Sequence, residues 1–200
     1  MKENIKNIVV LLNIYRLLPT WLIICCCKNA SIIREDMQRW LKLMQIDRSG
    51  IIGFGRLLRF KEYRNLVYKR VKASNFFLSI VVKILWPQLD TLYIDTDAKN
   101  IGGGGGLFIQ HGFSTIISAE SIGSNCWINQ QVTIGYEGKG CPIIGNNVRI
   151  CAGAKIIGNI SVGDNSIIGA NAVVVKDVPS DVTVGGIPAK VIRYHSMDKA

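Results

Sequence analysis

The stretch IIGNNVRICAGAKIIGNISVGDNSIIGANAVVV, residues 143–175, carries an aliphatic residue at every sixth position. The residues with this spacing fall in two series: Ile144, Ile150, Ile156, Val162, Ile168 and Val174, preceded by Ile116, Ile122, Ile128 and Ile134. An amphipathic helix has a period of 3.6 residues and a half-buried strand a period of 2, so neither explains the pattern. A six-residue repeat predicts a parallel β-helix of short strands, with the aliphatic side chains stacked inside.

Other positions of the repeat fit the same interpretation. Glycine and asparagine recur where the chain has to turn, and both tolerate positive φ. Small residues at the fifth place of the repeat suit a narrow interior: Cys126, Ala154, Ser166 and Ala172. With three strands and about eighteen residues in a coil, the repeats predict slightly more than three coils.

The interval from Ile134 to Ile144 is longer than the others. We expect the residues between them, Tyr136 to Cys141, to leave the wall of the β-helix as a loop. Such a loop either covers a site or is a tolerated surface insertion.

The first part of the chain has a helical pattern. From Asn4 to about Leu85 apolar residues recur at spacings of three and four, and helix-breaking residues are few. The residue before a proline is pushed out of the helical region, so Trp86-Pro87 is expected to end the last helix. We therefore predict a helical region over residues 1–87, a β-helix domain over 88–193 and a tail over 194–200.

The run from Ile8 to Cys27 is apolar enough to raise the question of a transmembrane helix. Arg16 lies in its middle, where a charge inside a bilayer is costly. The alternative is a buried or interfacial amphipathic helix that breaks near Pro19. The run lacks the features of a signal peptide.

The excess positive charge lies in the first 90 residues. They contain 16 Lys or Arg against 6 Asp or Glu, whereas residues 91–200 contain 8 of each. Such charge would attract an anionic membrane surface, an acidic glycan or a nucleic acid, unless it is a solvated face without a dedicated partner. The chain has no recognised nucleic-acid-binding motif, so we expect no nucleic-acid partner.

The six cysteines are not arranged as metal ligands. Cys25 to Cys27 are adjacent, and the other three lie in apolar or glycine-containing runs. We interpret them as reduced thiols of a cytoplasmic protein, used mainly as small hydrophobic residues, and expect no metal site.

Three segments resemble the hexapeptide-repeat acyltransferases: INQQVTIG (residues 128–135), CAGAKIIGNISVGDNSIIGANAVVVKDVP (151–179) and VGGIPAKVI (184–192). Over about residues 90–193 the chain looks most like the serine O-acetyltransferases and their relatives in polysaccharide gene clusters. The resemblance implies a left-handed parallel β-helix, homotrimers or higher oligomers with active sites between subunits, and acetyl-coenzyme A as the donor.

The resemblance also implies a general base. In serine acetyltransferases a histidine that follows the first glycine-rich coil is the base, and an aspartate near the start of that coil orients it. His111 occupies the first position and Asp95 matches the second. Acetyl transfer to a hydroxyl needs a base as the alcohol attacks, and neutral imidazole titrates near the operating pH. His195 lies in the polar tail and is expected to be structural.

The run Gly102–Gly106 directly precedes this region. We interpret it as a tight corner that lets a backbone or ligand come close, with a flexible loop as the alternative. It is not a phosphate-binding loop, because no Gly-Lys-Ser/Thr sequence follows.

Donor binding is implied along the later coils. Small residues there match positions where the pantetheine arm lies against the wall: Gly135, Ala152, Gly153, Gly169 and Ala170. Lys176 and Lys190 are candidates to bind the coenzyme phosphates, or else are exposed solubilising charges.

Two features depart from the serine acetyltransferase pattern. The loop region GYEGKGCPIIG, residues 135–145, lacks the family's Arg-His pair, and Gln110 replaces an aspartate before the catalytic histidine. The acceptor is therefore left open between serine and a sugar hydroxyl in surface-polysaccharide assembly. Residues 1–90 would suit peripheral contact with a membrane that holds such a sugar.

Functions of other classes are less well supported by the sequence. A non-catalytic β-helix scaffold with a decayed site is one alternative. A zinc-dependent carbonic anhydrase on the same fold needs several histidine ligands, and the chain has two histidines.

Overall fold

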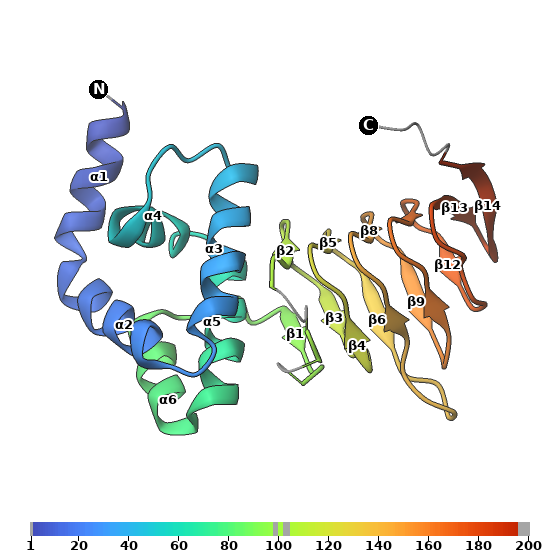
Figure 1. The fold of residues 1–200 in the computed structure, drawn as a ribbon, viewed down its shortest axis with the longest axis horizontal. Coiled ribbons are helices and arrows are strands. Elements are labelled where there is room, and N and C mark those ends of the chain that lie inside the picture. Colours follow the sequence, from blue (N-terminus) through green and yellow to red (C-terminus); the bar gives the residue numbers. More distant parts are fainter. Residues whose placement is uncertain (1, 98–99, 102–104, 196–200) are drawn as a thin grey trace. The chain divides into compact units, whose positions relative to one another are not determined.

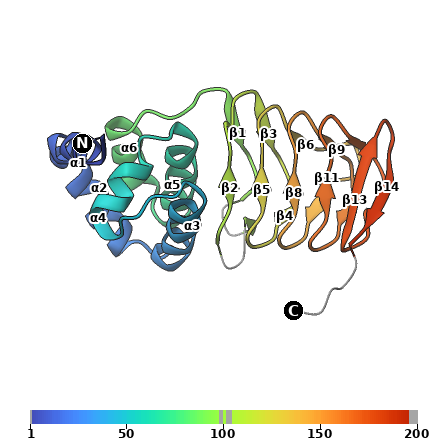
Figure 2. The same cartoon turned by 90° about the horizontal axis from the view of Figure 1, so that it is seen from above.

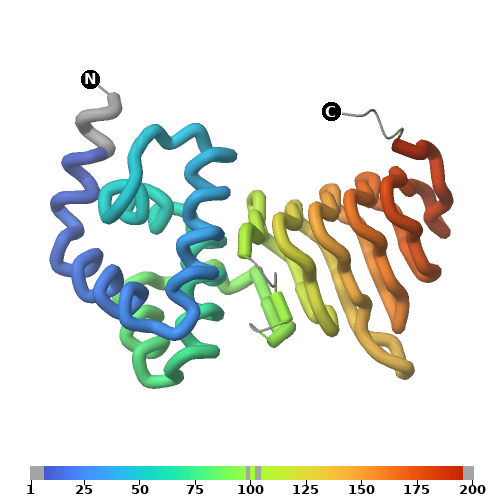
Figure 3. Tube along the Cα trace, in the orientation of Figure 1, coloured from blue at the N-terminus to red at the C-terminus, as the bar shows by residue number. Residues whose placement is uncertain are grey.

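The computed structural model describes residues 2–97, 100–101 and 105–195, with the backbone alone for residues 2–6 (Figure 3). Residues 102–104 of the glycine run lie outside the described residues. The chain divides into two compact units, Met1–Leu89 and Asp90–Ala200. The first is helical and the second is a parallel β-solenoid of about five coils (Figure 1).

Helices account for most of the first unit. In chain order they are α1 (Lys2–Leu12), α2 (Ile14–Cys26), α3 (Ala30–Leu43), α4 (Gly50–Leu57), α5 (Lys61–Ser74) and α6 (Phe76–Leu85). Their shared core contains large side chains that are at most 1% exposed, among them Trp40, Phe54, Tyr63 and Leu66. The predicted helical N-terminal region is confirmed, and its last helix ends before Trp86 as expected.

The first apolar run breaks at Asn13 rather than at Pro19. The Asn13 side-chain amide donates a hydrogen bond to the Val9 carbonyl at 2.8 Å, which competes with continuation of the helix. Pro19 lies inside α2, where the ring removes a single backbone donor. The expected break near Pro19 is therefore wrong. Among the described residues, no helix is both long and apolar enough to cross a membrane.

The predicted role of the cysteines is partly right. The six cysteines, all among the described residues, form no disulfide, and Cys27 and Cys126 are buried. Cys25 and Cys26 are exposed, so they do not serve as core residues.

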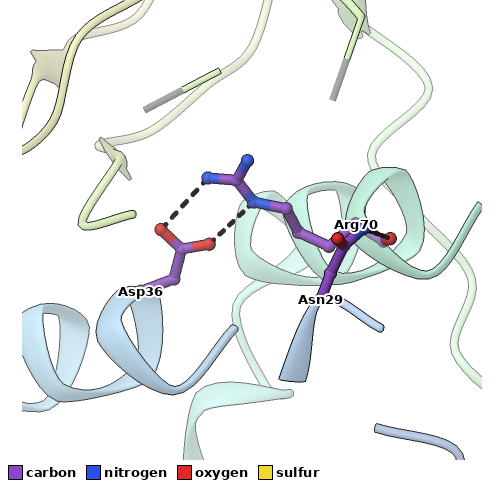
Figure 4. Close-up of polar contacts among 3 residues, drawn as sticks. All are labelled: Asn29, Asp36 and Arg70. Carbon is purple, nitrogen blue, oxygen red and sulfur yellow. Dashed lines mark hydrogen bonds and ion pairs between the residues drawn. The ribbon is translucent and has the colours of Figure 1, made fainter. Parts of the chain in front are cut away.

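A buried ion pair joins α3 to α5 (Figure 4). Arg70 Nε donates to Asp36 Oδ2 at 3.0 Å, and both side chains are at most 2% exposed. Asn29, just before α3, donates from Nδ2 to the Arg70 backbone carbonyl at 2.8 Å. Because both charges are out of water, each helps to compensate the other.

We predict that Arg70→Met lowers the free energy of unfolding by about 3–5 kcal/mol, because it leaves the Asp36 charge buried without its ion-pair partner. The double variant Asp36→Leu/Arg70→Met removes both charges and should recover most of that loss. Urea unfolding followed by circular dichroism measures both values. A double variant as unstable as the single one would contradict this account.

Three parallel sheets share the coils of the second unit. The five-stranded sheet contains β1 (Leu92–Ile94), β3 (Thr115–Ile117), β6 (Thr133–Gly135), β9 (Lys155–Ile157) and β12 (Val173–Val174). The three-stranded sheet contains β4 (Ser121–Ile122), β7 (Ile143–Ile144) and β10 (Ser161–Val162). The six-stranded sheet contains β2 (Phe108–Ile109), β5 (Trp127–Ile128), β8 (Arg149–Ile150), β11 (Ile167–Ile168), β13 (Val182–Gly186) and β14 (Ala189–Tyr194).

Strands of successive coils lie side by side (Figure 2). All of these pairs are parallel except β13 with β14, which form an antiparallel hairpin at the end of the solenoid. The predicted parallel β-helix is confirmed.

The number of coils predicted from the repeats was too low. The structure has about five coils rather than slightly more than three. Chain on either side of the regular repeats also winds into coils, with Leu92, Ile101 and Val178 as interior residues at most 6% exposed. Isolated bridges pair Ile101 with Ile122 and Val162 with Val178, which extends the three-stranded wall at both ends.

One predicted interior residue points outward. Ile116 is 45% exposed, whereas its neighbour Ile117 is fully buried and pairs in register with Ile134. The step from Ile117 to Ile122 is five residues, so this corner is one residue shorter than the repeat. The interior assignment of Ile116 is wrong, because two adjacent isoleucines conceal the shorter step. The other nine aliphatic residues are at most 2% exposed, and the four predicted small interior residues are fully buried.

Polar side chains hold successive coils together at one corner. Asn147 Nδ2 donates to Asn165 Oδ1 at 3.0 Å, and Asn165 Nδ2 donates to Asp181 Oδ1 at 2.8 Å. All three residues have φ between 55° and 59°, which Asn and Asp adopt more readily than most side chains. The predicted asparagine corners are confirmed.

We predict that Ile117→Ala destabilises the protein by about 2–5 kcal/mol, because it leaves a cavity in a narrow interior. Ile143→Ala, at an isoleucine that is 42% exposed on the three-stranded sheet, serves as the matched control. The control should lose less than about 1 kcal/mol. Equal shifts of the two variants in chemical unfolding would show that Ile117 is not interior.

Candidate active site

His111 lies at the corner where the six-stranded sheet leads into the five-stranded sheet, named here the His111 corner. In the sheets, Ile109 pairs with Ile128 and Ile116 pairs with Thr133 of the next coil. Six residues lie between Ile109 and Ile116, whereas four lie between Ile128 and Thr133. The first coil therefore has two extra residues at this corner. A strand inside a coil cannot take up extra residues without losing its register, so the corner bulges outward.

Backbone contacts fix both ends of this bulge. The Gln110 N–H donates to the Ile128 carbonyl at 2.8 Å, and the Gln131 N–H donates to the Phe113 carbonyl at 3.0 Å. Between these anchors the Phe113 N–H donates to the His111 carbonyl, and His111 has a φ of 59°. The imidazole is exposed on a short turn whose ends are both held by the next coil.

Small residues occupy the same corner on later coils. Ala152 and Gly153 lie there on the third coil, and Gly169 and Ala170 on the fourth. With coils about 4.8 Å apart, they are about 10 and 14 Å from His111 along the solenoid. The structure thus brings four predicted donor-binding residues and the predicted base onto one edge.

Glycine is required at one position of this edge. Gly153 has a φ of +75°, and a Cβ there would lie 2.0 Å from Asn171 Oδ1. The small residues leave a wall without projecting side chains, named here the shelf (Ala152, Gly153, Gly169 and Ala170).

Lys190 lies at the end of the shelf. Lys190 pairs with Gly185 in the terminal hairpin. Val184, the residue before Gly185, accepts a hydrogen bond on its carbonyl from the Gly169 N–H at 2.8 Å. The Lys190 side chain is exposed, as the binding of a coenzyme phosphate would require.

The remaining predicted site residues lie at a second corner, where the five-stranded sheet leads into the three-stranded sheet. Asp95 follows β1, Gly135 ends β6, and Lys176 lies two residues beyond β12. The Asp95 N–H donates to the Ile117 carbonyl at 2.8 Å, and Ser118 Oγ donates to Asp95 Oδ2 at 3.5 Å. A three-residue strand about 10 Å long separates this far corner from the His111 corner, so one chain does not bring Asp95 beside His111.

The inserted loop also leaves the wall at the far corner (Figure 1). It connects β6 to β7 and closes on itself, with Glu137 and Gly140 forming an antiparallel bridge. The Tyr136 hydroxyl donates to the Gly138 carbonyl at 3.1 Å. Within one chain this loop does not adjoin the His111 corner.

Two polar side chains of the second coil were not predicted as site residues. Asn129 Oδ1 and Gln130 Oε1 are buried and accept no hydrogen bond from the residues that the structure describes. Gln130 aligns with His111 when the pairing of Ile109 with Ile128 is continued. Unsatisfied buried acceptors are costly, so the contacts within one chain do not account for these two side chains. The polar run that follows Ile128 in INQQVTIG is the sequence feature that could have indicated these two side chains.

The second histidine has a local partner. His195 Nε2 lies 2.8 Å from Thr183 Oγ1, and the His195 N–H donates to the Asp181 carbonyl at 2.7 Å. These contacts attach the end of the described chain to the terminal hairpin, which fits the structural role expected for His195.

Parts of the chain resemble known proteins. Residues 141–176 match a family described as bacterial transferase hexapeptide (six repeats). Over 94 residues the chain is 50% identical to a serine acetyltransferase of Synechococcus elongatus, a match that covers 44% of this chain and 38% of that protein. The chain therefore spans less than half the length of this curated relative.

Solved serine acetyltransferases resemble a larger part of the chain. The Brucella abortus strain S19 enzyme in complex with coenzyme A gives a TM-score of 0.61 at 29% identity, covering 84% of this chain and 68% of that one. The Neisseria gonorrhoeae enzyme in complex with serine gives 0.63 at 27% identity, covering 82% and 69%. The resemblance to hexapeptide-repeat serine acetyltransferases is confirmed.

Proposed function

We propose that this protein is an acetyl-CoA-dependent O-acetyltransferase with His111 as its general base. The observation that carries the proposal is the common edge of the solenoid, on which one exposed imidazole and the shelf lie in line. The coenzyme A complex of the Brucella abortus relative supports acetyl-CoA as the donor.

The proposed reaction needs one proton acceptor. His111 takes the proton from the acceptor hydroxyl while the hydroxyl oxygen attacks the thioester carbonyl carbon. A C–O bond forms, the C–S bond breaks, and the imidazolium returns the proton to the coenzyme A thiolate. A positioned base of this kind contributes about 10²- to 10⁴-fold to the rate.

We propose that the site is completed between subunits of a homotrimer. His111 and the shelf lie at one corner, whereas Asp95, Gly135, Lys176 and the inserted loop lie at another. In a three-fold ring each interface joins two different patches, so one subunit's His111 corner can meet its neighbour's far corner. Asp95 would then orient the histidine of the adjacent chain, and Lys176 and Lys190 would approach the coenzyme phosphates from the two sides.

The acceptor is the finer question, and one observation favours a sugar hydroxyl over serine. The inserted loop contains neither arginine nor histidine, and the residue before His111 is Gln110, so the pattern associated with serine binding is absent at these positions. The serine complex of the Neisseria gonorrhoeae relative supports the other alternative. We propose a cytoplasmic protein whose basic residues 1–90 contact the membrane peripherally when the acceptor is membrane-bound.

We predict that His111→Gln lowers the rate of thiol release from acetyl-CoA about 10²- to 10⁴-fold, because the variant cannot accept the proton. His195→Gln is the matched control and should retain activity near that of the wild type. Detection of free coenzyme A with a thiol reagent measures both rates. Unchanged thiol release in His111→Gln, or none in the wild type with any acceptor, would favour the non-catalytic scaffold.

The acceptor is tested by supplying acetyl-CoA with serine in one reaction and with nucleotide sugars in another. We expect faster thiol release with a sugar, because the site lacks the loop arginine and histidine. Mass spectrometry should then find the sugar heavier by one acetyl group. Turnover with serine alone would reject the sugar acceptor.

A further inference from the structure

A pocket of about 270 Å³ in the helical unit is lined by three arginines. Arg16 comes from α2, Arg59 follows α4, and Arg64 comes from α5. The rest of its described lining is neutral: Val9, Val10, Asn13, Leu17, Gly55 and Trp86. The acetyl transfer proposed above uses none of these residues.

The Trp86 indole holds two of the arginines. The Arg16 Cζ lies 4.4 Å from the ring centroid and the Arg64 Cζ lies 5.5 Å from it. The ring itself is fixed, because it is buried and its Nε1 donates to Thr20 Oγ1 at 2.9 Å. Two positive groups therefore share one aromatic surface.

Most of the guanidinium donors remain available. Arg64 donates from Nε to the Leu58 carbonyl and from Nη1 to the Pro87 carbonyl, the latter at 2.9 Å. In the described part of the chain, the Arg16 and Arg59 guanidinium groups donate no hydrogen bond and form no ion pair. Since a guanidinium carries five N–H donors, the pocket presents many donors and no acidic acceptor.

The like charges act on one another. Burial lowers the pKa of Arg64, the charge of Arg16 lowers it further, and Glu62 acts in the opposite direction. A bound anion would offset the repulsion between the arginines.

We propose that this pocket binds a phosphate group. The planar fork of arginine matches phosphate oxygens in pairs. The pocket offers the forks of Arg16 and Arg59, and the remaining donors of Arg64, around one neutral space. The group can belong to a lipid headgroup or to a soluble phosphate ester. Leu11, Leu12 and Tyr15 in α1 and α2 are 58%, 70% and 69% exposed, and such apolar side chains beside a cationic site suit a membrane interface.

The experiment uses the full chain and two double variants. Arg16→Gln/Arg59→Gln removes two pocket charges, and Arg34→Gln/Arg48→Gln removes two exposed charges elsewhere in the helical unit. One arm titrates inorganic pyrophosphate by calorimetry. The other co-sediments the protein with vesicles of phosphatidylglycerol in phosphatidylcholine, and with vesicles of phosphatidylcholine alone.

We expect the pocket variant to lose at least tenfold in affinity relative to the wild type and to the control variant. Loss in the pyrophosphate arm shows that a soluble phosphate compound is sufficient, and loss confined to the anionic vesicles identifies a lipid headgroup. Equal binding by both variants, or binding in neither arm by the wild type, would overturn the proposal. Thermal unfolding verifies that the variants fold, and the single variant Arg59→Gln, at an exposed position, replaces a double variant that does not.

Thiol release from acetyl-CoA by the pocket variant provides the independent readout. Because the pocket lies in the helical unit, soluble-acceptor turnover should stay within twofold of the wild type. Failure of phosphate binding would thus leave the acetyl-transfer proposal intact. Absence of acetyl transfer would likewise leave the phosphate-binding proposal intact.

Discussion

Each coil of the second unit has to return to the same three corners while filling a narrow interior. Ile134 and Ile156 exemplify the result, since both are fully buried and lie in register on neighbouring coils. A wall made of one short strand cannot take up an extra residue without turning the interior side chains outward. Irregularities are therefore confined to corners, which is where both the extra residues beside His111 and the loop after Gly135 occur.

This confinement determines where chemistry can be placed. A corner stacks along the solenoid at about 4.8 Å per coil, so a projecting group on one coil and small residues on later coils form a continuous edge. His111 and Ala170 are related in this way, and an extended thioester could lie between them. Asp95 follows β1, whereas His111 precedes β3, the parallel partner of β1, so the two residues lie at opposite ends of this strand pair. The proposed pairing of Asp95 with a histidine therefore depends on a neighbouring subunit.

The regular repeats made the β-helix predictable, since an aliphatic residue at every sixth position fits no helix or simple strand. The irregular coils were not predictable, and the reasons are local. Ile116 and Ile117 are chemically alike, so the sequence did not indicate that the corner after them is one residue shorter. The helix break was placed at Pro19 because the hydrogen bond of the Asn13 side chain to the Val9 carbonyl could not be predicted. Within the site, His111 and the shelf could be predicted to lie near one another. The distance between Asp95 and His111, and the buried acceptor oxygens of Asn129 and Gln130, became clear only from the structure.

The most direct test of the central claim is a crystal structure of the full chain with coenzyme A. The account predicts that the pantetheine arm lies along the shelf, past Ala152 and Ala170, with the sulfur within about 4 Å of a His111 imidazole. Coenzyme A bound along another edge, with its sulfur far from every His111 in the oligomer, would contradict it.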